Sequence, residues 1–292
     1  MQFDALSQLR LALPKGRMQA GVFALLADAG IDIQAGSGER AYRPRVNLPG
    51  VETKLLKPQN IVEMLAMGSR DIGFAGGDWV AEIGAEVVEL LDTALDPVRI
   101  VAATLTELSE CIFDSTRPLV VASEYENLTR KWIAAKGLKA TFVRSFGATE
   151  AFPPEDADCI VDCTATGSTL KANNLAIVDE LMVSSTRLYA YPRALDIPHK
   201  REAIEHFILL VKSALEARTR VMIELNVSID KLEVMAKMLP CMRRPTVSPL
   251  QGNEGYAIKS AVPKHLLPDL IPQIKKLGGT DIVITKLAQI VP

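Results

Sequence analysis

Short apolar runs that alternate with stretches of helical spacing set the strongest limit on the fold of this chain. In the first part of the sequence, strands are predicted over residues 9–13, 51–56 and 71–75. Helical spacing covers residues 18–29 and 58–67, and each of these helices stops at a glycine, Gly30 or Gly68. Strands and helices that alternate in this way form a mostly parallel sheet with helices on its faces. The sequence therefore predicts an α/β fold.

The same rhythm starts again after a strand predicted at residues 98–104. This second unit contains predicted strands at 118–122, 140–144 and 159–161, and a helix at 127–136. The segment Tyr189-Ala190-Tyr191-Pro192 looks like another crossing strand that returns the chain to the first unit. Two crossings would leave two lobes joined by two hinges, and a cleft between lobes is a favoured place for a ligand.

The C-terminal part of the chain has a different pattern. After a connecting helix at 201–218, the predicted order is strand, helix, strand, strand, helix, strand, over residues 221–227, 229–239, 246–250, 256–262, 264–277 and 281–284. This is the split βαβ, or ferredoxin-like, arrangement. Such a domain often senses a ligand or mediates assembly, and the alternative is a plain structural extension.

Composition narrows the classes of function. The 292 residues are 48% hydrophobic and 23% charged, which favours large buried cores over disorder. A formal net charge of -2 argues against a general nucleic-acid binder. Neither a membrane span nor a signal peptide is apparent. The four cysteines include no Cys-x-x-Cys pair, so buried free thiols in a cytoplasmic protein are expected rather than a zinc site.

The stretch at residues 158–170 reads Asp-Cys-Ile-Val-Asp-Cys-Thr-Ala-Thr-Gly-Ser-Thr-Leu. A buried strand ends there on Asp162 and is followed by hydroxyl side chains, a glycine and a helix predicted over 170–176. Hydroxyls and backbone N–H groups at a helix N-terminus can cradle a phosphate, and the carboxylate can accept hydrogen bonds from sugar hydroxyls. The stretch predicts a site for a phosphorylated ribose. An ordinary strand–turn–helix connection is the alternative.

Two cations follow the first predicted strand. Lys15 and Arg17 are separated by Gly16 at a helix entry, where they can hold a polyphosphate as a point charge and a bidentate fork. An ordinary basic loop is the alternative.

Two further positions carry carboxylates at predicted cleft edges. Gly76 and Gly77 would let a ligand approach the backbone closely, and Asp78 begins the next helix, either as a simple N-cap or as a ligand for a base or ribose. Glu150 lies on the approach to the strand at 159–161. The sequence contains no Gly-x-Ser-x-Gly elbow, and none of its histidines lies in a setting that suggests a catalytic triad. Nucleophilic catalysis is therefore not favoured.

Together these motifs resemble the long form of ATP phosphoribosyltransferase. The stretches that match are 11–17, 57–61, 71–78, 147–150, 157–175 and 244–250. They follow the family's order along nearly the whole chain, and residues 157–175 are the most specific of them. Asn60 stands where an aspartate is common, and Asn174 where a glycine is common.

The resemblance implies two lobes like those of a periplasmic binding protein, formed by residues 1–103 with 186–212 and by residues 104–185. It also implies a regulatory domain at 213–292 that binds histidine, an equilibrium between dimers and hexamers, and a requirement for Mg²⁺ held mainly by substrate phosphates. The reaction would join N1 of ATP to C1 of phosphoribosyl pyrophosphate and release pyrophosphate. The alternatives are a phosphoribosyltransferase that acts on a free base and a two-lobed ligand sensor without enzymatic activity.

The resemblance also implies roles for single residues. Lys15, Arg17 and Glu150 would be catalytic, and Lys57, Gly76 and Asp78 would contact the nucleotide. Arg244 and Thr246 would serve the allosteric site. The phosphoribosyl group would be bound by Asp162, Thr164, Ala165, Thr166, Gly167, Ser168 and Thr169.

Overall fold

The computed structural model describes residues 8–34 and 42–291, apart from the side chain of Asn253. The chain divides into two compact units, Met1–Ala24 with Asp32–Glu205 and Leu25–Ile31 with His206–Pro292. Both units combine helices and strands, so the predicted α/β class is confirmed. The predicted boundaries between the lobes, and at residue 213, stay predictions.

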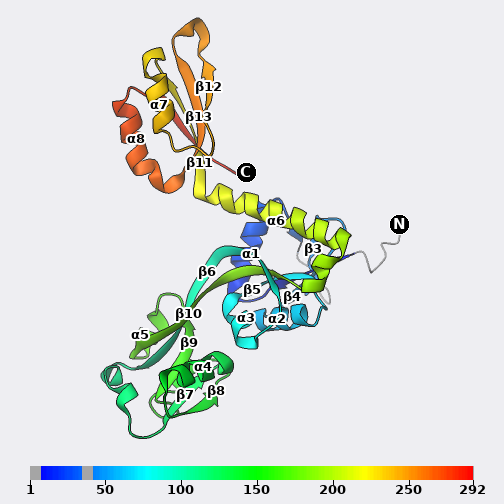
Figure 1. Ribbon diagram of the computed structural model, residues 1–292, viewed down its shortest axis with the longest axis vertical. Coiled ribbons are helices and arrows are strands. Elements are labelled where there is room, and N and C mark those ends of the chain that lie inside the picture. The colour runs from blue at the N-terminus through cyan, green and yellow to red at the C-terminus, as the bar shows by residue number, and fades with distance from the viewer. Residues whose placement is uncertain (1–7, 35–41, 292) are drawn as a thin grey trace. The chain divides into compact units, whose positions relative to one another are not determined.

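An eight-stranded sheet runs through the first unit in the order β4-β1-β5-β10-β6-β9-β7-β8. Its strands are β1 (Leu9–Pro14), β4 (Val51–Leu56), β5 (Ile72–Gly76), β6 (Val88–Leu105), β7 (Leu119–Ser123), β8 (Ala140–Arg144), β9 (Cys159–Thr164) and β10 (Leu175–Ala190). Two short strands, β2 (Ile33–Gln34) and β3 (Arg45–Val46), pair separately. Figure 1 shows how β6 and β10 connect the two ends of the large sheet.

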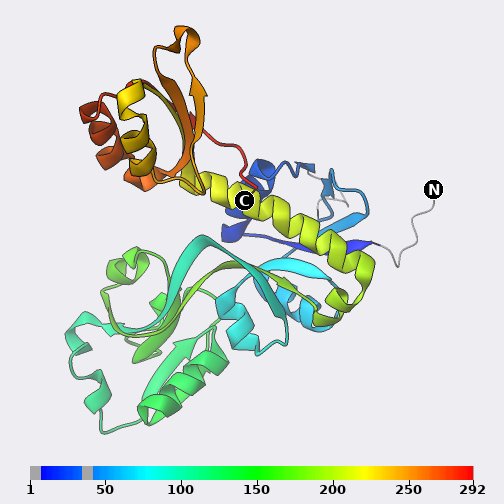
Figure 2. The same cartoon turned by 45° about the horizontal axis from the view of Figure 1, so that its top comes forward.

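The large sheet consists of two parallel groups joined by long antiparallel strands. Strands β4, β1 and β5 are parallel to one another, and so are β9, β7 and β8. Between them, β10 pairs antiparallel with both β5 and β6, and β6 pairs antiparallel with β9. The same pair of crossing strands lies side by side in both ribbon views (Figures 1 and 2). The two-lobed catalytic region is therefore confirmed, with β6 and β10 as its two crossings.

Helices follow the parallel strands, as the sequence predicts. They are α1 (Arg17–Asp28), α2 (Pro58–Ala66), α3 (Gly77–Ile83), α4 (Glu126–Lys136) and α5 (Ser168–Ala172). The strands beneath them are apolar on both faces, as is typical of a covered parallel sheet; Leu11, Phe74 and Val161 are completely buried. Because α1, α3 and α5 each start just after a strand ends, the loops at the carboxyl ends of β1, β5 and β9 carry the predicted site residues.

Two predictions about local structure are wrong. The crossing strands are much longer than the predicted 98–104 and 189–192, because their exposed outer parts carry charged residues and several register shifts that interrupt the apolar pattern. The helix predicted over 170–176 instead covers Ser168–Ala172. Asn174 then turns the chain in a left-handed conformation, with a φ of 55°, so that β10 can begin at Leu175.

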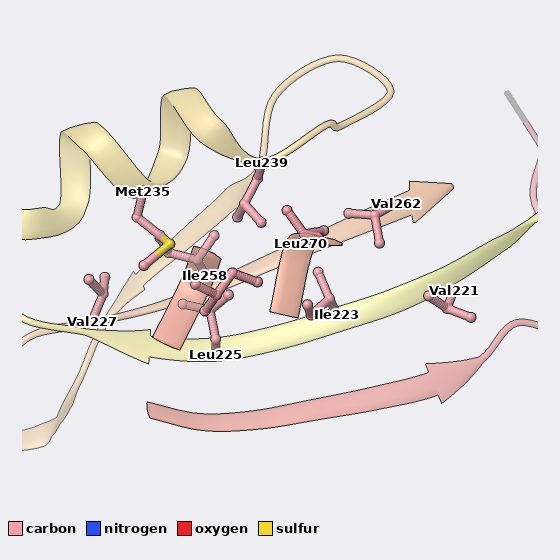
Figure 3. Close-up of a cluster of buried hydrophobic side chains, with 10 residues drawn as sticks. Val221, Ile223, Leu225, Val227, Met235, Leu239, Ile258, Val262 and Leu270 are labelled. Atoms are coloured by element: carbon pink, nitrogen blue, oxygen red, sulfur yellow. The ribbon is translucent and has the colours of Figure 1, made fainter. Parts of the chain in front are cut away.

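The second unit contains the predicted ferredoxin-like domain. The long helix α6 (Pro198–Thr219) leads into strands β11 (Arg220–Val227), β12 (Thr246–Pro249), β13 (Tyr256–Pro263) and β14 (Thr280–Lys286), with α7 (Leu232–Met238) and α8 (Leu267–Lys276) between them. The sheet order is β12-β13-β11-β14, and all three pairings are antiparallel. Alternate residues of β11 are buried, and Val221, Ile223 and Leu225 belong to one hydrophobic cluster with Met235 and Leu270 of the two helices (Figure 3). The βαββαβ prediction is confirmed.

Candidate active site

The main cleft of the first unit lies at the carboxyl ends of the parallel strands. It has a volume of about 390 Å³, and its walls include Lys15, Arg17, Gly76 and Asp78. Lys15 follows β1, where Gly16 takes a φ of 82° that turns the chain into α1. The predicted cationic and glycine-rich loops are thus brought together in one cleft.

The predicted phosphoribosyl loop lines a second hollow of about 290 Å³. Every residue assigned to the phosphoribosyl group except Gly167 lines this hollow: Asp162, Thr164, Ala165, Thr166, Ser168 and Thr169. Glu150 and Arg17 line it as well. Arg17 and Cys163 line both this hollow and the main cleft, so the two spaces adjoin at these side chains. The Arg17 Nη2 atom lies 4.0 Å from the Cys163 Sγ atom.

Gly167 shapes the loop. Its φ of 77° is in the left-handed region that a glycine adopts without cost. Its backbone N–H donates a 2.9 Å hydrogen bond to the Thr164 hydroxyl, which closes the turn and orients that side chain. The N–H of Gly167 is therefore used inside the loop. A ligand would meet the hydroxyls of Thr166, Ser168 and Thr169 instead, all of which belong to exposed residues.

The surroundings of the Asp162 carboxyl group disfavour its charged form. Burial raises its pKa to about 6, and the nearby charges of Glu150 and Glu124 act in the same direction. A 2.6 Å hydrogen bond from the backbone N–H of Cys163 opposes this shift. A carboxylate that is destabilised before binding gains by accepting hydrogen bonds from a ligand's hydroxyl groups.

Asp78 is buried in the cleft wall, and each of its carboxylate oxygens accepts a hydrogen bond from a protein group. Its Oδ2 accepts a 2.8 Å hydrogen bond from the Tyr125 hydroxyl, and its Oδ1 accepts a 2.7 Å bond from Ser184. The helix N-cap is Gly76, so the alternative interpretation of Asp78 as an N-cap is wrong. A Cβ atom at Gly76 would lie 2.1 Å from the Asp78 Oδ1, which shows that this glycine makes room for the carboxylate.

The two predicted lysines, Lys15 as a catalytic residue and Lys57 as a nucleotide contact, differ in position. The Lys15 Nζ lies 4.2 Å from the centre of the Tyr42 ring, in a cation–π contact at the main cleft. Lys57 is instead found in a neighbouring hollow of about 350 Å³, with Arg144 and the exposed Phe146. Because the two hollows share the side chains of Gln59, Trp79 and Glu124, Lys57 lies next to the main cleft rather than in it.

Several residues of the main cleft are not predicted from the sequence. They are Gln59, Asp96, Glu124, Tyr125 and Ser184. The run Ser184-Ser185-Thr186, with three hydroxyls in one strand, was the only available signal, and it lies in the part of β10 that was not predicted. Burial among apolar groups and the charge of Asp78 raise the pKa of Tyr125, which keeps its hydroxyl as a hydrogen-bond donor.

The proposed allosteric residues lie in the second unit. Arg244 and Thr246 are both exposed, where the chain enters the edge strand β12. The four cysteines are free, but Cys159 alone among them is buried, so the expectation of buried thiols holds for that residue only. Within residues 8–34 and 42–291, no group of three His, Cys, Asp or Glu side chains is arranged to hold a metal ion. The same described residues contain no helix that is long and apolar enough to span a membrane.

Comparison with known proteins identifies the family. A model described as ATP phosphoribosyltransferase matches residues 57–213, and one described as the HisG C-terminal domain matches residues 217–289. The ATP phosphoribosyltransferase of Pelotomaculum thermopropionicum is 35% identical over 98% of this chain and 100% of its own length. That of Desulforudis audaxviator is 37% identical over the same shares.

A solved structure agrees with these matches. The ATP phosphoribosyl transferase (HisG:HisZ) complex from Thermotoga maritima has a TM-score of 0.62 at 27% identity, covering 70% of this chain and 97% of that chain. The matched C-terminal domain supports the long form, and the named relatives favour transfer to ATP over the free-base and sensor alternatives. This chain therefore belongs to the ATP phosphoribosyltransferase family, as a member of its long form.

Proposed function

We propose that the two adjoining hollows of the first unit bind the two substrates of the family's reaction. That reaction transfers the 5-phosphoribosyl group to N1 of ATP in the first step of histidine biosynthesis. The loop Thr164–Thr169 holds the 5′-phosphate of phosphoribosyl pyrophosphate, and ATP occupies the main cleft. The observation that carries this assignment is that Arg17 lines both hollows, which is where two reacting substrates must meet.

The residues around this junction fit the charges that develop during transfer. Pyrophosphate leaves from C1 while the ribose acquires cationic, oxocarbenium-like character. Arg17 and Lys15 stabilise the departing negative charge, and Arg17 does so as a fork that can bind two phosphate oxygens. Asp162 and Glu150 line the ribose side of the hollow, where Asp162 accepts hydrogen bonds from the ribose hydroxyls and both carboxyl groups favour a cationic ribose. The protein's contributions are then to position the two anionic substrates and to stabilise the departing charge.

Mg²⁺ fits this site as a partner of the substrates. The described residues provide no cluster of three ligands, whereas Mg²⁺ commonly keeps its waters and binds through substrate phosphates. Bound there, the ion would neutralise pyrophosphate charge. The carboxylates of Asp162 and Glu150 line the phosphoribosyl hollow and could contact the ion or its waters.

Replacement of Arg17 tests the assignment. We expect Arg17→Ala to lower kcat/KM for both substrates by about 100-fold or more, as for the loss of one preorganised electrostatic group. Arg17→Lys keeps the charge without the fork and should recover only part of the rate. A coupled assay of pyrophosphate release measures both. Near-normal kcat/KM in Arg17→Ala would show that the junction is elsewhere.

We also propose the lobe boundaries given above and feedback inhibition by histidine at the 213–292 domain. The support is the ferredoxin-like fold of this region and its match to the family's C-terminal domain. Arg244→Ala and Thr246→Ala, made in the full chain, should raise the histidine concentration needed for half-inhibition. Pyrophosphate release titrated with histidine tests this, and an unchanged inhibition curve in both variants would exclude this location.

The remaining proposals concern assembly and compartment. Dimers and hexamers are expected from the family resemblance, and sedimentation velocity with and without histidine would measure their proportions. The free thiols suit a reducing cytoplasm.

A further inference from the structure

Helix α4 begins with backbone groups that its own N-cap does not satisfy. Within the described part of the chain, the N-cap residue Tyr125 makes no side-chain hydrogen bond to the helix. The N–H groups of the second and third helical residues, Asn127 and Leu128, are the ones that a capping side chain normally binds. Here both donate to the carboxylate of Glu82, at 3.0 Å and 2.9 Å. Glu82 thus caps a helix to which it does not belong.

The cap comes from the opposite part of the sheet. Glu82 lies on α3, which follows β5, whereas α4 follows β7, and three strands separate β5 from β7 in the sheet. The side chain of Asn127 reinforces the contact by donating a 2.8 Å hydrogen bond to the backbone carbonyl of Glu82. The contact therefore ties the first parallel group of strands to the second.

A second carboxylate, one turn earlier on α3, binds the residue just before α4. Asp78 accepts the hydroxyl hydrogen bond of Tyr125, and the ring of the neighbouring Trp79 stacks on Tyr125 with 4.7 Å between ring centres. Both carboxylates are buried, with Glu82 only 5% exposed. Burying a carboxylate is costly unless hydrogen bonds compensate, so these contacts fix one arrangement of the two helices.

The chain segment held by this contact forms a wall of the main cleft. Glu124 and Tyr125 line the cleft together with Lys15 and Arg17, whereas Glu82 itself does not line it. We propose that Glu82 is a positioning residue that caps α4 from the opposite lobe and thereby places the Glu124–Tyr125 wall for the acceptor nucleotide. The inference rests on the proposed function, because it names the residue that sets the geometry of the ATP half of that site.

Because the phosphoribosyl loop follows β9 rather than β7, the two substrates should respond differently. Loss of the cap in Glu82→Ala should raise KM for ATP by about tenfold, which is the fold-change that follows when a cap energy of about 1.4 kcal/mol is lost from ATP binding. KM for phosphoribosyl pyrophosphate should change by less than about twofold. Glu82→Gln keeps one carbonyl oxygen as an acceptor and should recover most of the ATP affinity. Glu86→Ala is the matched control, since it removes the same charge from an exposed position four residues further on.

The experiment is pyrophosphate release by the full chain with each substrate varied in turn. Calorimetric ATP binding and hydrogen exchange at the Asn127 and Leu128 amides accompany it. Faster exchange at these amides together with a selective rise in KM for ATP is the expected result. Equal changes in both KM values, or an unchanged KM for ATP with faster exchange, would overturn the positioning role.

Two further outcomes keep the test decisive. If Glu82→Ala does not fold, Glu82→Gln carries the test: a rise in KM for ATP of about threefold is expected, and an unchanged KM for ATP would contradict the inference. If the wild type binds ATP but releases no pyrophosphate, the proposed reaction fails. The Kd for ATP then replaces KM as the measure of the wall's position, so the two failures are distinguishable.

Discussion

Replacement of Asp162 by asparagine should make the protein more stable and less active. Burial raises the pKa of this carboxyl from its ordinary value of 3.8 to about 6. At about 1.36 kcal/mol per pKa unit, this corresponds to about 3 kcal/mol against the charged form, and to about 1–3 kcal/mol after allowance for solvent near this half-buried group. Asp162→Asn removes the charge and should raise the free energy of unfolding near neutral pH by that amount.

The pH dependence gives this prediction its sign. Between pH 3.8 and about 6 the folded protein holds the Asp162 proton more tightly than the unfolded chain does. Its stability therefore falls as the pH rises through this window. The variant escapes this loss, so its advantage over the wild type should be close to zero at about pH 4 and fully developed above about pH 7.

The assay can be confined to the catalytic region. The two tryptophans of the chain, Trp79 and Trp132, both lie in the first unit, so unfolding followed by tryptophan fluorescence reports on it. Asp158→Asn is the matched control, four residues earlier. The Arg117 guanidinium donates a 2.8 Å hydrogen bond to Asp158 and holds the pKa of that carboxyl below its ordinary value. That variant should be less stable than the wild type near neutral pH.

Activity completes the test. Loss of a charged acceptor for the ribose hydroxyls should lower kcat/KM for phosphoribosyl pyrophosphate by about 10- to 100-fold. If Asp162→Asn were no more stable than the wild type at pH 7.5, or equally more stable at pH 4, the burial argument would be wrong. A stabilised variant with full activity would instead refute the ribose contact.

Two other substitutions test the packing of the first unit and of its cleft. Asp71 accepts hydrogen bonds from Arg10 and Lys200 at 2.8–3.0 Å. Burial alone would raise the pKa of the Asp71 carboxyl, but these hydrogen bonds hold that pKa below its ordinary value. Asp71→Asn should lower the free energy of unfolding by about 3–5 kcal/mol at neutral pH. This difference in stability from the wild type should shrink as the pH falls through the lowered pKa of Asp71. A difference that does not change with pH would contradict the ion-pair explanation. Gly76→Ala should push Asp78 away from Ser184 and raise KM for ATP. Gly84→Ala is the control: Gly84 has open space around it but a φ of 67°, so this variant should lose only about 1 kcal/mol of stability. Equal KM values in these two variants would refute the steric role of Gly76.

The sequence predicts the fold best where burial is uniform. Strands β1 and β5 are covered on both faces, so they read as continuous apolar runs, and their predicted bounds differ from the observed ones by one residue at most. Strand β9 continues to Thr164, three residues beyond the predicted 159–161, because Asp162 interrupts its apolar run. Strand β11 is predicted equally well from a different pattern, because every second residue is buried, as is typical of a strand with one covered face. The outer parts of β6 and β10 give neither pattern, because they cross between the lobes with exposed charged residues and register shifts.

The same contrast separates the two halves of the site. The phosphoribosyl loop is contiguous in sequence from Thr164 to Thr169, so its hydroxyls, its glycine and the preceding carboxylate could be recognised together. The ATP half is assembled from segments far apart in the chain. Asp78 meets Tyr125 across 47 positions and Ser184 across 106, and periodicity carries no information about such pairings.

Buried acids on a short helix show why this half was difficult to predict. On sequence alone, Asp78 and Glu82 are spaced one turn apart, as solvent-facing residues of an amphipathic helix would be. In the structure both are buried, because the first N–H groups of α4, which the N-cap residue Tyr125 leaves free, and the Tyr125 hydroxyl donate hydrogen bonds to them that only the tertiary fold supplies. The phosphate half of the site is thus encoded by local turn chemistry, whereas the acceptor half is encoded by pairs of residues. Removal of the Glu82 or Asp78 carboxylate should therefore disturb the start of α4, whereas a substitution in the Thr164–Thr169 loop should act through the geometry of that loop alone.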